Sequence, residues 1–287
     1  MQVKNMYEYE SVCLQITTKC NFMCRHCYLS CGPHRNEIME KVVIDAAIEK
    51  IGSKSKRVWI SGGEATLFPD LIEYIVKKCF QSREKTGYPH EICLQTNGAW
   101  ALNYESAISE MDKYSEMGIT DLDLSGYDKF HYEFHKGMSI LELGALADRL
   151  HLFNSVVVSG SPNVDLKYLG RGKDLRNNLV FKNDCVLANG NYNINVYGDI
   201  LICKWGNTCY LGSILEKNLD SIEKLEFVKI LNNKGILGLI EEYNKKFGQN
   251  ITFDGSTDIC EICHKITADW KMYISEHQEY VIDMLCG

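Results

Sequence analysis

The alternation of strand-like and helix-like segments constrains the fold of this 287-residue chain more than any other feature. Short runs rich in β-branched residues occupy 12–18, 57–63, 91–97, 121–126 and 155–160. Amphipathic stretches separate them at 37–52, 70–81, 104–118 and 139–153, and two of these stretches end in glycine, as helices often do. Strands and helices in turn predict parallel βαβ units and therefore an α/β fold.

The pattern changes after about residue 180. Residues 165–172 fit a sixth parallel strand, whereas 191–203 predict a β-hairpin that turns at Tyr197–Asp199. Helices are expected around 216–247. We therefore expect two domains, one over residues 1–180 and a smaller one over residues 181–287, in a chain long enough to bury a full core.

Composition and charge exclude several classes of protein. Apolar residues make up 45% and charged residues 24%, which is typical of a globular protein. The 31 Lys and Arg residues against 38 Asp and Glu residues give a net charge of −7, so on average the chain repels a phosphate backbone or an anionic membrane surface. We expect neither nucleic acid nor membrane as a partner. With no signal peptide and no membrane-length apolar run, we expect a cytoplasmic location.

Three of the 13 cysteines lie within eight residues, directly after the first predicted strand. In a reducing compartment such closely spaced thiols indicate metal ligands rather than disulfides, whereas Cys13 and Cys79 fit small apolar side chains. Cys20, Cys24 and Cys27 leave a zinc ion one ligand short, unless His26 or Cys31 completes the set. Three thiolates suit an iron–sulfur cube with one open iron.

The spacing C-x3-C-x2-C followed by Tyr28 resembles the signature of the radical S-adenosylmethionine (radical SAM) enzymes. In that family the open iron binds the amino and carboxylate groups of S-adenosylmethionine (AdoMet). Reductive cleavage of AdoMet then yields a 5′-deoxyadenosyl radical that abstracts a substrate hydrogen atom. The resemblance implies a [4Fe-4S] cluster on the three cysteines, cofactor contacts from His26 and Tyr28, and an electron donor such as flavodoxin or ferredoxin.

A second motif, ISGGEATLFP at 60–69, resembles the GGE segment of the same family. Gly62 and Gly63 are expected to let the backbone approach a ligand, and the Glu64 carboxylate to accept a hydrogen bond from the AdoMet ammonium group. The family more often has proline where this chain has Ala65. The position of the motif at the end of a predicted strand supports this assignment, because the carboxyl ends of the strands form the active-site rim of such barrels.

The next strand ends add further candidates. By resemblance, Asn97 and Ser125 would contact the ribose or the methionine carboxylate of AdoMet, Asp128 would lie near them, and Arg171 would pair with the carboxylate. A simple helix-capping turn is the alternative for residues 96–98. The resemblance covers about residues 12–175 and implies a partial (β/α)6 barrel, similar to part of a TIM barrel.

The later cysteines form a second set. Cys185, Cys203, Cys260 and Cys263 occur in an order that resembles the twitch form of the SPASM auxiliary-cluster domain, which implies a second [4Fe-4S] cluster. Four thiolates also suit zinc, which stays the alternative.

The combination of TNGAW, SGYDKFHYEF and this cysteine order resembles radical SAM enzymes that epimerise or crosslink ribosomally made peptides. Those epimerases carry a donor cysteine directly after the hairpin ligand, where this chain has Lys204. Cys209 would have to return the hydrogen atom instead. Otherwise a thioether or carbon–carbon crosslink is expected.

Two other functions compete with peptide modification. One is dehydrogenation of an aminocyclitol alcohol, with His131 or His135 as a base if they share a helix face. The short stretch before the first predicted strand is not expected to hold a domain that binds a peptide leader. This slightly favours a small-molecule substrate, unless a separate protein delivers the peptide. The other is a non-catalytic zinc-binding scaffold. Iron content separates the scaffold from the enzymes, which require about eight irons per chain.

Overall fold

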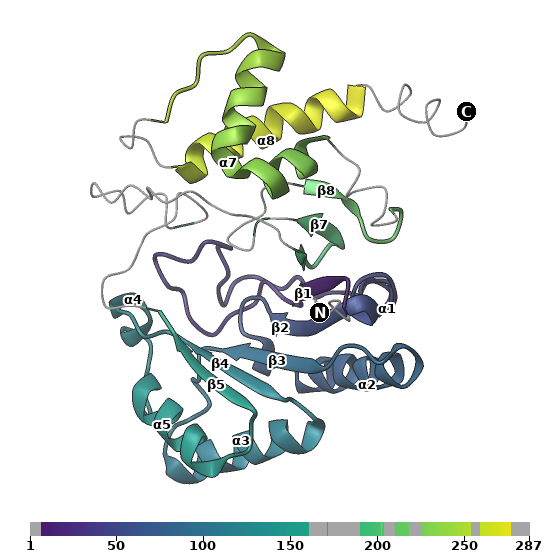
Figure 1. Cartoon of the computed structure of the whole chain (residues 1–287). Helices are drawn as coiled ribbons and strands as arrows, with labels where there is room; N and C mark the ends of the chain where they lie inside the picture. The colour runs from purple at the N-terminus through teal and green to yellow at the C-terminus, as the bar shows by residue number, and fades with distance from the viewer. Residues whose placement is uncertain are drawn as a thin grey trace, which may run out of the picture.

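The computed structural model describes residues 7–160, 171, 190–201, 203, 210–217, 226–253 and 259–276. Within them, eight strands form one sheet in the order β5-β4-β3-β2-β1-β6-β7-β8 (Figure 1). The strands are β1 (Tyr9–Gln15), β2 (Ser55–Ser61), β3 (Glu91–Thr96), β4 (Asp121–Ser125), β5 (Ser155–Ser159), β6 (Asn191–Ile194), β7 (Asp199–Leu201) and β8 (Tyr210–Ser213). The first five lie where the alternation predicts strands.

The neighbours among β1 to β5 pair in parallel, as the βαβ pattern predicts. The connecting helices are α1 (Lys41–Lys50), α2 (Pro69–Thr86), α3 (Tyr104–Met117), α4 (Lys129–Tyr132) and α5 (Ile140–Leu150), with the 3₁₀ turns η1 (Gly52–Lys54) and η2 (Ala65–Leu67). Local sequence sets the helix ends: Asn103 and Ser139 form capping boxes that start α3 and α5. Gly118, with a φ of 103°, ends α3.

The two faces of the parallel sheet differ in chemistry. One face carries fully buried apolar side chains such as Leu14, Ile60 and Leu94, and α1, α2, α3 and α5 lie along this side (Figure 1). The intervening positions form the opposite face, which carries Ser61, Gln95 and other polar residues. Most parallel strands are apolar on both faces. A polar face therefore indicates a surface kept for a function rather than for core packing.

The predicted hairpin is confirmed, because β6 and β7 pair antiparallel across a turn at Gly198, whose φ is 84°. The hairpin extends the first sheet, since β6 pairs in parallel with β1. The sheet therefore crosses the boundary expected near residue 180. Within the described residues, two helices follow β8, namely α7 (Glu226–Phe247), interrupted at Gly235, and α8 (Ile259–Glu276).

The sheet does not close into a barrel within the described residues, because β5 and β8 are its two ends. This open, mostly parallel α/β arrangement is consistent with the expected partial (β/α)6 barrel. The sixth strand predicted at 165–172 lies outside the described residues, apart from Arg171.

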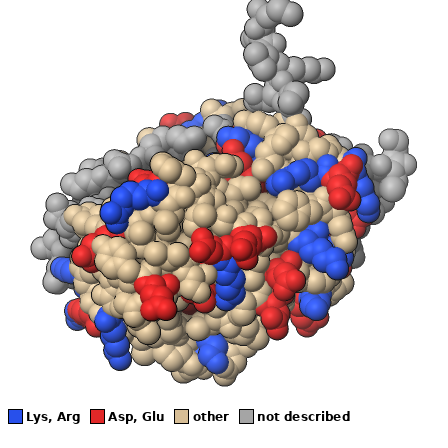
Figure 2. All heavy atoms as spheres, turned by 90° about the horizontal axis from the view of Figure 1, so that it is seen from below, with Lys and Arg blue, Asp and Glu red and all other residues tan. Residues whose placement is uncertain are grey.

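No helix among the described residues is both long and apolar enough to span a membrane. On the face shown in Figure 2, acidic and basic side chains are interspersed over a mostly uncharged surface. Among the described residues, that face therefore offers no continuous basic surface to a phosphate backbone.

Candidate functional site

The cysteine motif lies on a long loop that leaves the carboxyl end of β1 and returns to it. Two isolated bridges close the loop at its base, Thr17 with Ile38 and Lys19 with Gly32. Backbone hydrogen bonds also tie it to the turn after β2, from Gly63 N to Thr17 O (2.7 Å) and from Glu64 N to Lys19 O (2.9 Å). The loop is thus fixed to the rim of the sheet although it has no regular secondary structure.

The predicted cluster ligands lie in a small apolar cluster of their own. Cys20 and Cys24 are buried against Phe22 there, and Cys27 packs at the edge of this cluster. Burial raises the pKa of the Cys20 thiol to about 12, while the Phe22 amide, 3.3 Å from Sγ, favours the thiolate. Thiols that are this costly to ionise alone are suited to a cation that stabilises the thiolate form.

Cys27 differs from the other two predicted ligands. A hydrogen bond from Cys31 lowers the pKa of the Cys27 thiol to about 6, against the opposing effect of burial. Arg171 also approaches this part of the loop: its backbone N donates to Cys27 O (2.9 Å) and its Nε to Cys24 O (3.0 Å). Its Nη2 is buried and has no hydrogen-bond partner among the described residues. Arg171 therefore holds the loop and keeps one donor for an anionic group.

The Glu64 carboxylate is buried and accepts four hydrogen bonds. Oε1 accepts from Thr66 N (3.2 Å), Thr66 Oγ1 (2.6 Å) and Thr96 Oγ1 (2.7 Å), and Oε2 accepts from Asn97 N (2.8 Å). Burial raises the pKa of Glu64 although these donors oppose the rise. Oε2 keeps a lone pair for the predicted AdoMet ammonium group, while the other bonds join the ends of β2 and β3.

The structure gives the two glycines of the motif a packing role that the sequence did not indicate. A Cβ on Gly63 would lie 2.1 Å from Lys19 O, and one on Gly62 would lie 2.5 Å from Thr17 O. The close approach here is therefore to the backbone that leads into the cysteine loop. Direct contact of Gly62 and Gly63 with a cofactor stays a prediction.

The ends of β3 and β4 bring two further predicted residues to the same rim. Asn97 donates from Nδ2 to Asn21 Oδ1 (2.8 Å), and the same nitrogen lies 3.8 Å from Cys20 Sγ. Its Oδ1 accepts from Ala99 N, so a local turn also fixes this side chain. Ser125 Oγ donates weakly to Thr96 O (3.3 Å). Both residues lie at the rim where the resemblance predicts the cofactor.

Asp128 holds two histidines beside Cys24. Its Oδ1 caps α4 by accepting from the amides of Phe130 and His131, and its Oδ2 lies 2.5 Å from His131 Nδ1 and 3.7 Å from His26 Nε2. Burial alone would raise the pKa of Asp128, but the hydrogen bond with His131 lowers it overall. Burial lowers the pKa of His26 to about 4.

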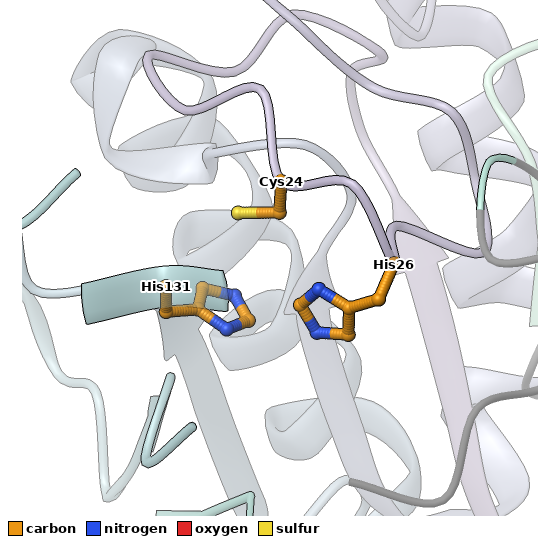
Figure 3. Close-up of side chains that lie close together, drawn as sticks. All are labelled: Cys24, His26 and His131. Atoms are coloured by element: carbon orange, nitrogen blue, oxygen red, sulfur yellow. The ribbon is translucent and has the colours of Figure 1, made fainter. Parts of the chain in front are cut away.

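The condition that His131 and His135 share a helix face is not met, because α4 ends at Tyr132 and His135 packs against Phe22. Instead, ligand atoms of Cys24, His26 and His131 lie within 4.8 Å of one another (Figure 3). Among the described residues, this is the one group of three metal-ligating side chains at that spacing. An iron–sulfur cube holds its thiolates further apart than a single ion does, so this group could alternatively bind one divalent cation.

Sequence reasoning missed a polar network on the polar face of the sheet. Ser61 Oγ donates to Gln95 Oε1 (2.5 Å), and Gln95 Nε2 donates to Asp123 Oδ2 (3.0 Å), across three adjacent strands. Asp123 Oδ1 is buried and has no hydrogen-bond partner among the described residues, while the nearby Ser159 hydroxyl opposes the rise in the pKa of Asp123 that burial causes. Cys13, expected among apolar residues, contacts Ser61 at the edge of this network. The alternation of apolar and polar residues within the strands could have predicted this polar face from the sequence.

The structure places three of the four cysteines predicted to hold a second cluster. Cys203 lies two residues after β7, and Cys260 and Cys263 lie in the first two turns of α8 at a spacing that puts both on one helix face. Cys185 and Cys209 lie outside the described residues.

Residues 14–142 match the profile of the Radical SAM superfamily. The matched stretch runs from β1 into α5 and contains the cysteine loop, the Gly-Gly-Glu turn and the rim residues at the ends of β3 and β4. This part of the chain therefore matches a radical SAM domain, a class whose cofactors are AdoMet and a [4Fe-4S] cluster.

Parts of the chain are also similar to individual proteins. A stretch of 138 residues is 28% identical to YydG of Bacillus subtilis (strain 168), whose name assigns it to peptide biosynthesis. The stretch covers 46% of this chain and only 40% of YydG. The fold is similar to that of BtrN in complex with AdoMet and 2-DOIA (TM-score 0.53, 15% identity, 78% of this chain and 87% of BtrN). It is equally similar to that of anSMEcpe with bound AdoMet and Cp18Cys peptide (TM-score 0.53, 14% identity, 96% and 98%).

The residues at the loop fit the cofactors of this class. Cys20, Cys24 and Cys27 are thiols held near one another in an apolar cluster, as soft ligands of an iron–sulfur cluster require. The orphaned Nη2 of Arg171 is a buried donor suited to a carboxylate, such as that of AdoMet. The Glu64 carboxylate suits an ammonium group on the same rim.

Proposed function

We propose that this chain is a radical SAM enzyme that modifies a ribosomally made peptide. The observation that carries the proposal is the junction of the three-thiol loop with the Gly-Gly-Glu turn at the carboxyl ends of β1 and β2. When bound, the reduced cluster and AdoMet supply a 5′-deoxyadenosyl radical that abstracts a substrate hydrogen atom. The relation to YydG supports a peptide as the substrate class.

The residues of the chain then have separate tasks. Cys20, Cys24 and Cys27 hold the cluster, and Asn97 orients the loop from the end of β3. Glu64 accepts from the AdoMet ammonium group, and Arg171 donates Nη2 to its carboxylate. His26, Tyr28, Ser125 and Asp128 line the same rim by resemblance.

The substrate is assigned to the polar face of the sheet. The unpaired Asp123 Oδ1 can accept from a peptide N–H, because a buried acceptor without a partner favours a ligand that supplies a donor. Asp123→Asn is expected to reduce peptide modification about tenfold, which corresponds to one lost hydrogen bond, while AdoMet cleavage without substrate continues. Asp121→Asn, two residues earlier on the same face, is the control. An equal loss in both variants would contradict this assignment.

The proposed reaction is tested by mass analysis of short peptides encoded beside this gene, incubated anaerobically with enzyme, AdoMet and reductant in deuterated solvent. A gain of one mass unit indicates inversion with solvent-derived hydrogen, and a loss of two indicates oxidation or a crosslink. Unchanged peptides, with an aminocyclitol losing two mass units instead, would favour the dehydrogenase. Cys20→Ala is expected to abolish 5′-deoxyadenosine formation, and Cys79→Ala, in α2, is the matched control.

The second cluster and its ligands Cys185, Cys203, Cys260 and Cys263 belong to the same proposal. A second cluster would accept the electron that remains after a crosslink. Cys260→Ala is expected to lower the iron content from about eight to about four per chain and to leave AdoMet cleavage intact. Cys209→Ala tests the hydrogen-atom donor, since loss of inversion alone identifies that role.

One observation favours a different class of function. Cys24, His26 and His131 lie close enough for one ion, and Asp128 binds the far nitrogen of His131, as carboxylates do behind metal-ligating histidines. A zinc-binding scaffold predicts one zinc ion and no iron at this loop. Metal analysis of His131→Ala distinguishes the zinc-binding scaffold from the iron–sulfur enzyme. Only zinc binding should depend on this histidine, so the variant should lose zinc but keep iron.

A further inference from the structure

Cys31 is a fourth thiol in the cysteine loop, for which the three-cysteine motif provides no role. It follows Cys27 after three residues, which extends the spacing to C-x3-C-x2-C-x3-C. The residue is only 2% exposed and belongs to the same apolar cluster as Cys20 and Cys24. The loop therefore encloses four thiols.

Two contacts fix the position of Cys31 among the predicted ligands. Its side chain packs in the apolar cluster against which Cys27 also packs, and its Sγ lies 4.0 Å from Leu29 O. The bridge between Lys19 and Gly32 also brings Cys31 towards Cys20, through bonds from Gly32 N to Thr18 O and from Cys20 N to Gly32 O (both 3.2 Å). In this parallel register Cys31 is opposite Thr18, and residues 18 and 20 share one side of their strand. Cys31 is thus a diagonal neighbour of Cys20.

The following inference rests on the proposed function. We propose that Cys31 is a displaceable fourth ligand of the [4Fe-4S] cluster, whose thiolate occupies the iron left open by Cys20, Cys24 and Cys27 until AdoMet binds. AdoMet would displace the Cys31 side chain, which would take up the proton that the AdoMet ammonium group loses, so charge and protons balance.

Such a ligand has two measurable effects. A fourth thiolate retains the iron that three-cysteine clusters lose on oxidation, so it reduces conversion to a [3Fe-4S] form. It also competes with AdoMet. If Cys31 is bound to the open iron in about nine-tenths of the enzyme molecules, the apparent AdoMet dissociation constant is roughly tenfold higher than without this ligand.

The test compares anaerobically reconstituted wild type, Cys31→Ala and Cys31→Ser with Cys79→Ala as control. Each protein is treated with ferricyanide, the [3Fe-4S] signal is quantified by electron paramagnetic resonance, and AdoMet affinity is measured by calorimetry. Both Cys31 variants are expected to give a larger [3Fe-4S] signal and roughly tenfold tighter AdoMet binding. A second cluster contributes equally to every protein and cancels in the comparison.

Equal signals and equal affinities in the wild type and the Cys31 variants would overturn the role of Cys31 and leave the proposed function intact. A wild-type protein that binds no iron at this loop would overturn both. If Cys31→Ala does not fold, Cys31→Ser decides, because its hydroxyl keeps the size and hydrogen bonding of the thiol but is a poor iron ligand.

Discussion

At the scale of single residues, Glu64 combines structural and chemical tasks. Its carboxylate is buried, which raises its pKa, yet four donors from three residues surround it. Those donors come from the turn after β2 and from the end of β3. The side chain therefore positions the rim before any cofactor is present.

Glu64→Gln is expected to destabilise the chain by about 2 kcal/mol, because the amide nitrogen faces donors and at least one charge-assisted hydrogen bond is lost. The measurement is the free energy of unfolding in urea. Glu73→Gln, exposed on α2, should change it by less than about 0.5 kcal/mol. Equal stability of both variants would show that the four hydrogen bonds contribute nothing net.

His26 predicts a pH dependence of stability in the cluster-free chain. Burial lowers its pKa from 6.5 to about 4, so the unfolded chain takes up this proton first as the pH falls. The stability from neutral His26 is complete above pH 6.5 and decreases towards pH 4. His26→Gln should therefore lose less stability than wild type over this interval, by at most about 3 kcal/mol. Parallel stability curves for the two proteins would contradict this pKa.

At the scale of elements, the cysteine loop has no regular structure of its own and depends on the turn after β2. Gly63 and Glu64 donate backbone hydrogen bonds to Thr17 and Lys19, directly before Cys20. A glycine is required at position 63 because the carbonyl of Lys19 occupies the space of a Cβ. The Gly-Gly-Glu motif thus positions the metal ligands as well as the predicted cofactor.

Gly63→Ala is expected to displace the loop, since the added methyl group would be 2.1 Å from a backbone oxygen. We expect a loss of about 3 kcal/mol, typical of overpacking against backbone, and a lower iron content after reconstitution. Gly87→Ala is the matched control, because its Cβ meets no atom within 4 Å and only the φ of 84° is unfavourable. That control should lose about 1 kcal/mol and keep its iron.

At the scale of the whole molecule, one sheet joins the two regions that the sequence separates near residue 180. β6 pairs with β1 over four residue pairs, and Ser11 Oγ donates to Asn191 Oδ1 at 2.6 Å. Without β6, β1 would be an unpaired edge, and unpaired edges promote association. The C-terminal region therefore completes the sheet that supports the cysteine loop.

A fragment of residues 1–180 is accordingly expected to associate and to unfold at a lower temperature than the full chain. Size-exclusion chromatography and thermal unfolding measure both effects. Co-expression with residues 181–287 should restore a species of full-length mass. A monomeric fragment with unchanged thermal stability would establish residues 1–180 as an independent domain.

The sequence by itself determined the parallel strands, the four main crossover helices and the loop that carries Cys20, Cys24 and Cys27. These features depend on interactions between residues near in the chain, namely strand alternation, helix caps and the spacing of thiols. Glu64 and Asn97 were likewise predicted at strand ends, because parallel strands bring their carboxyl ends to one rim.

Only the tertiary structure decided which atoms those residues contact. The tertiary structure pairs β6 with β1, packs Gly63 on Lys19 and buries Cys31 in one apolar cluster with Cys20 and Cys24. The unpaired oxygen of Asp123 likewise depends on neighbouring strands. The alternation of apolar and polar residues in the sequence predicts which face of a strand a residue lies on. The distance from that residue to a hydrogen-bond or packing partner depends on how segments far apart in the sequence pack together.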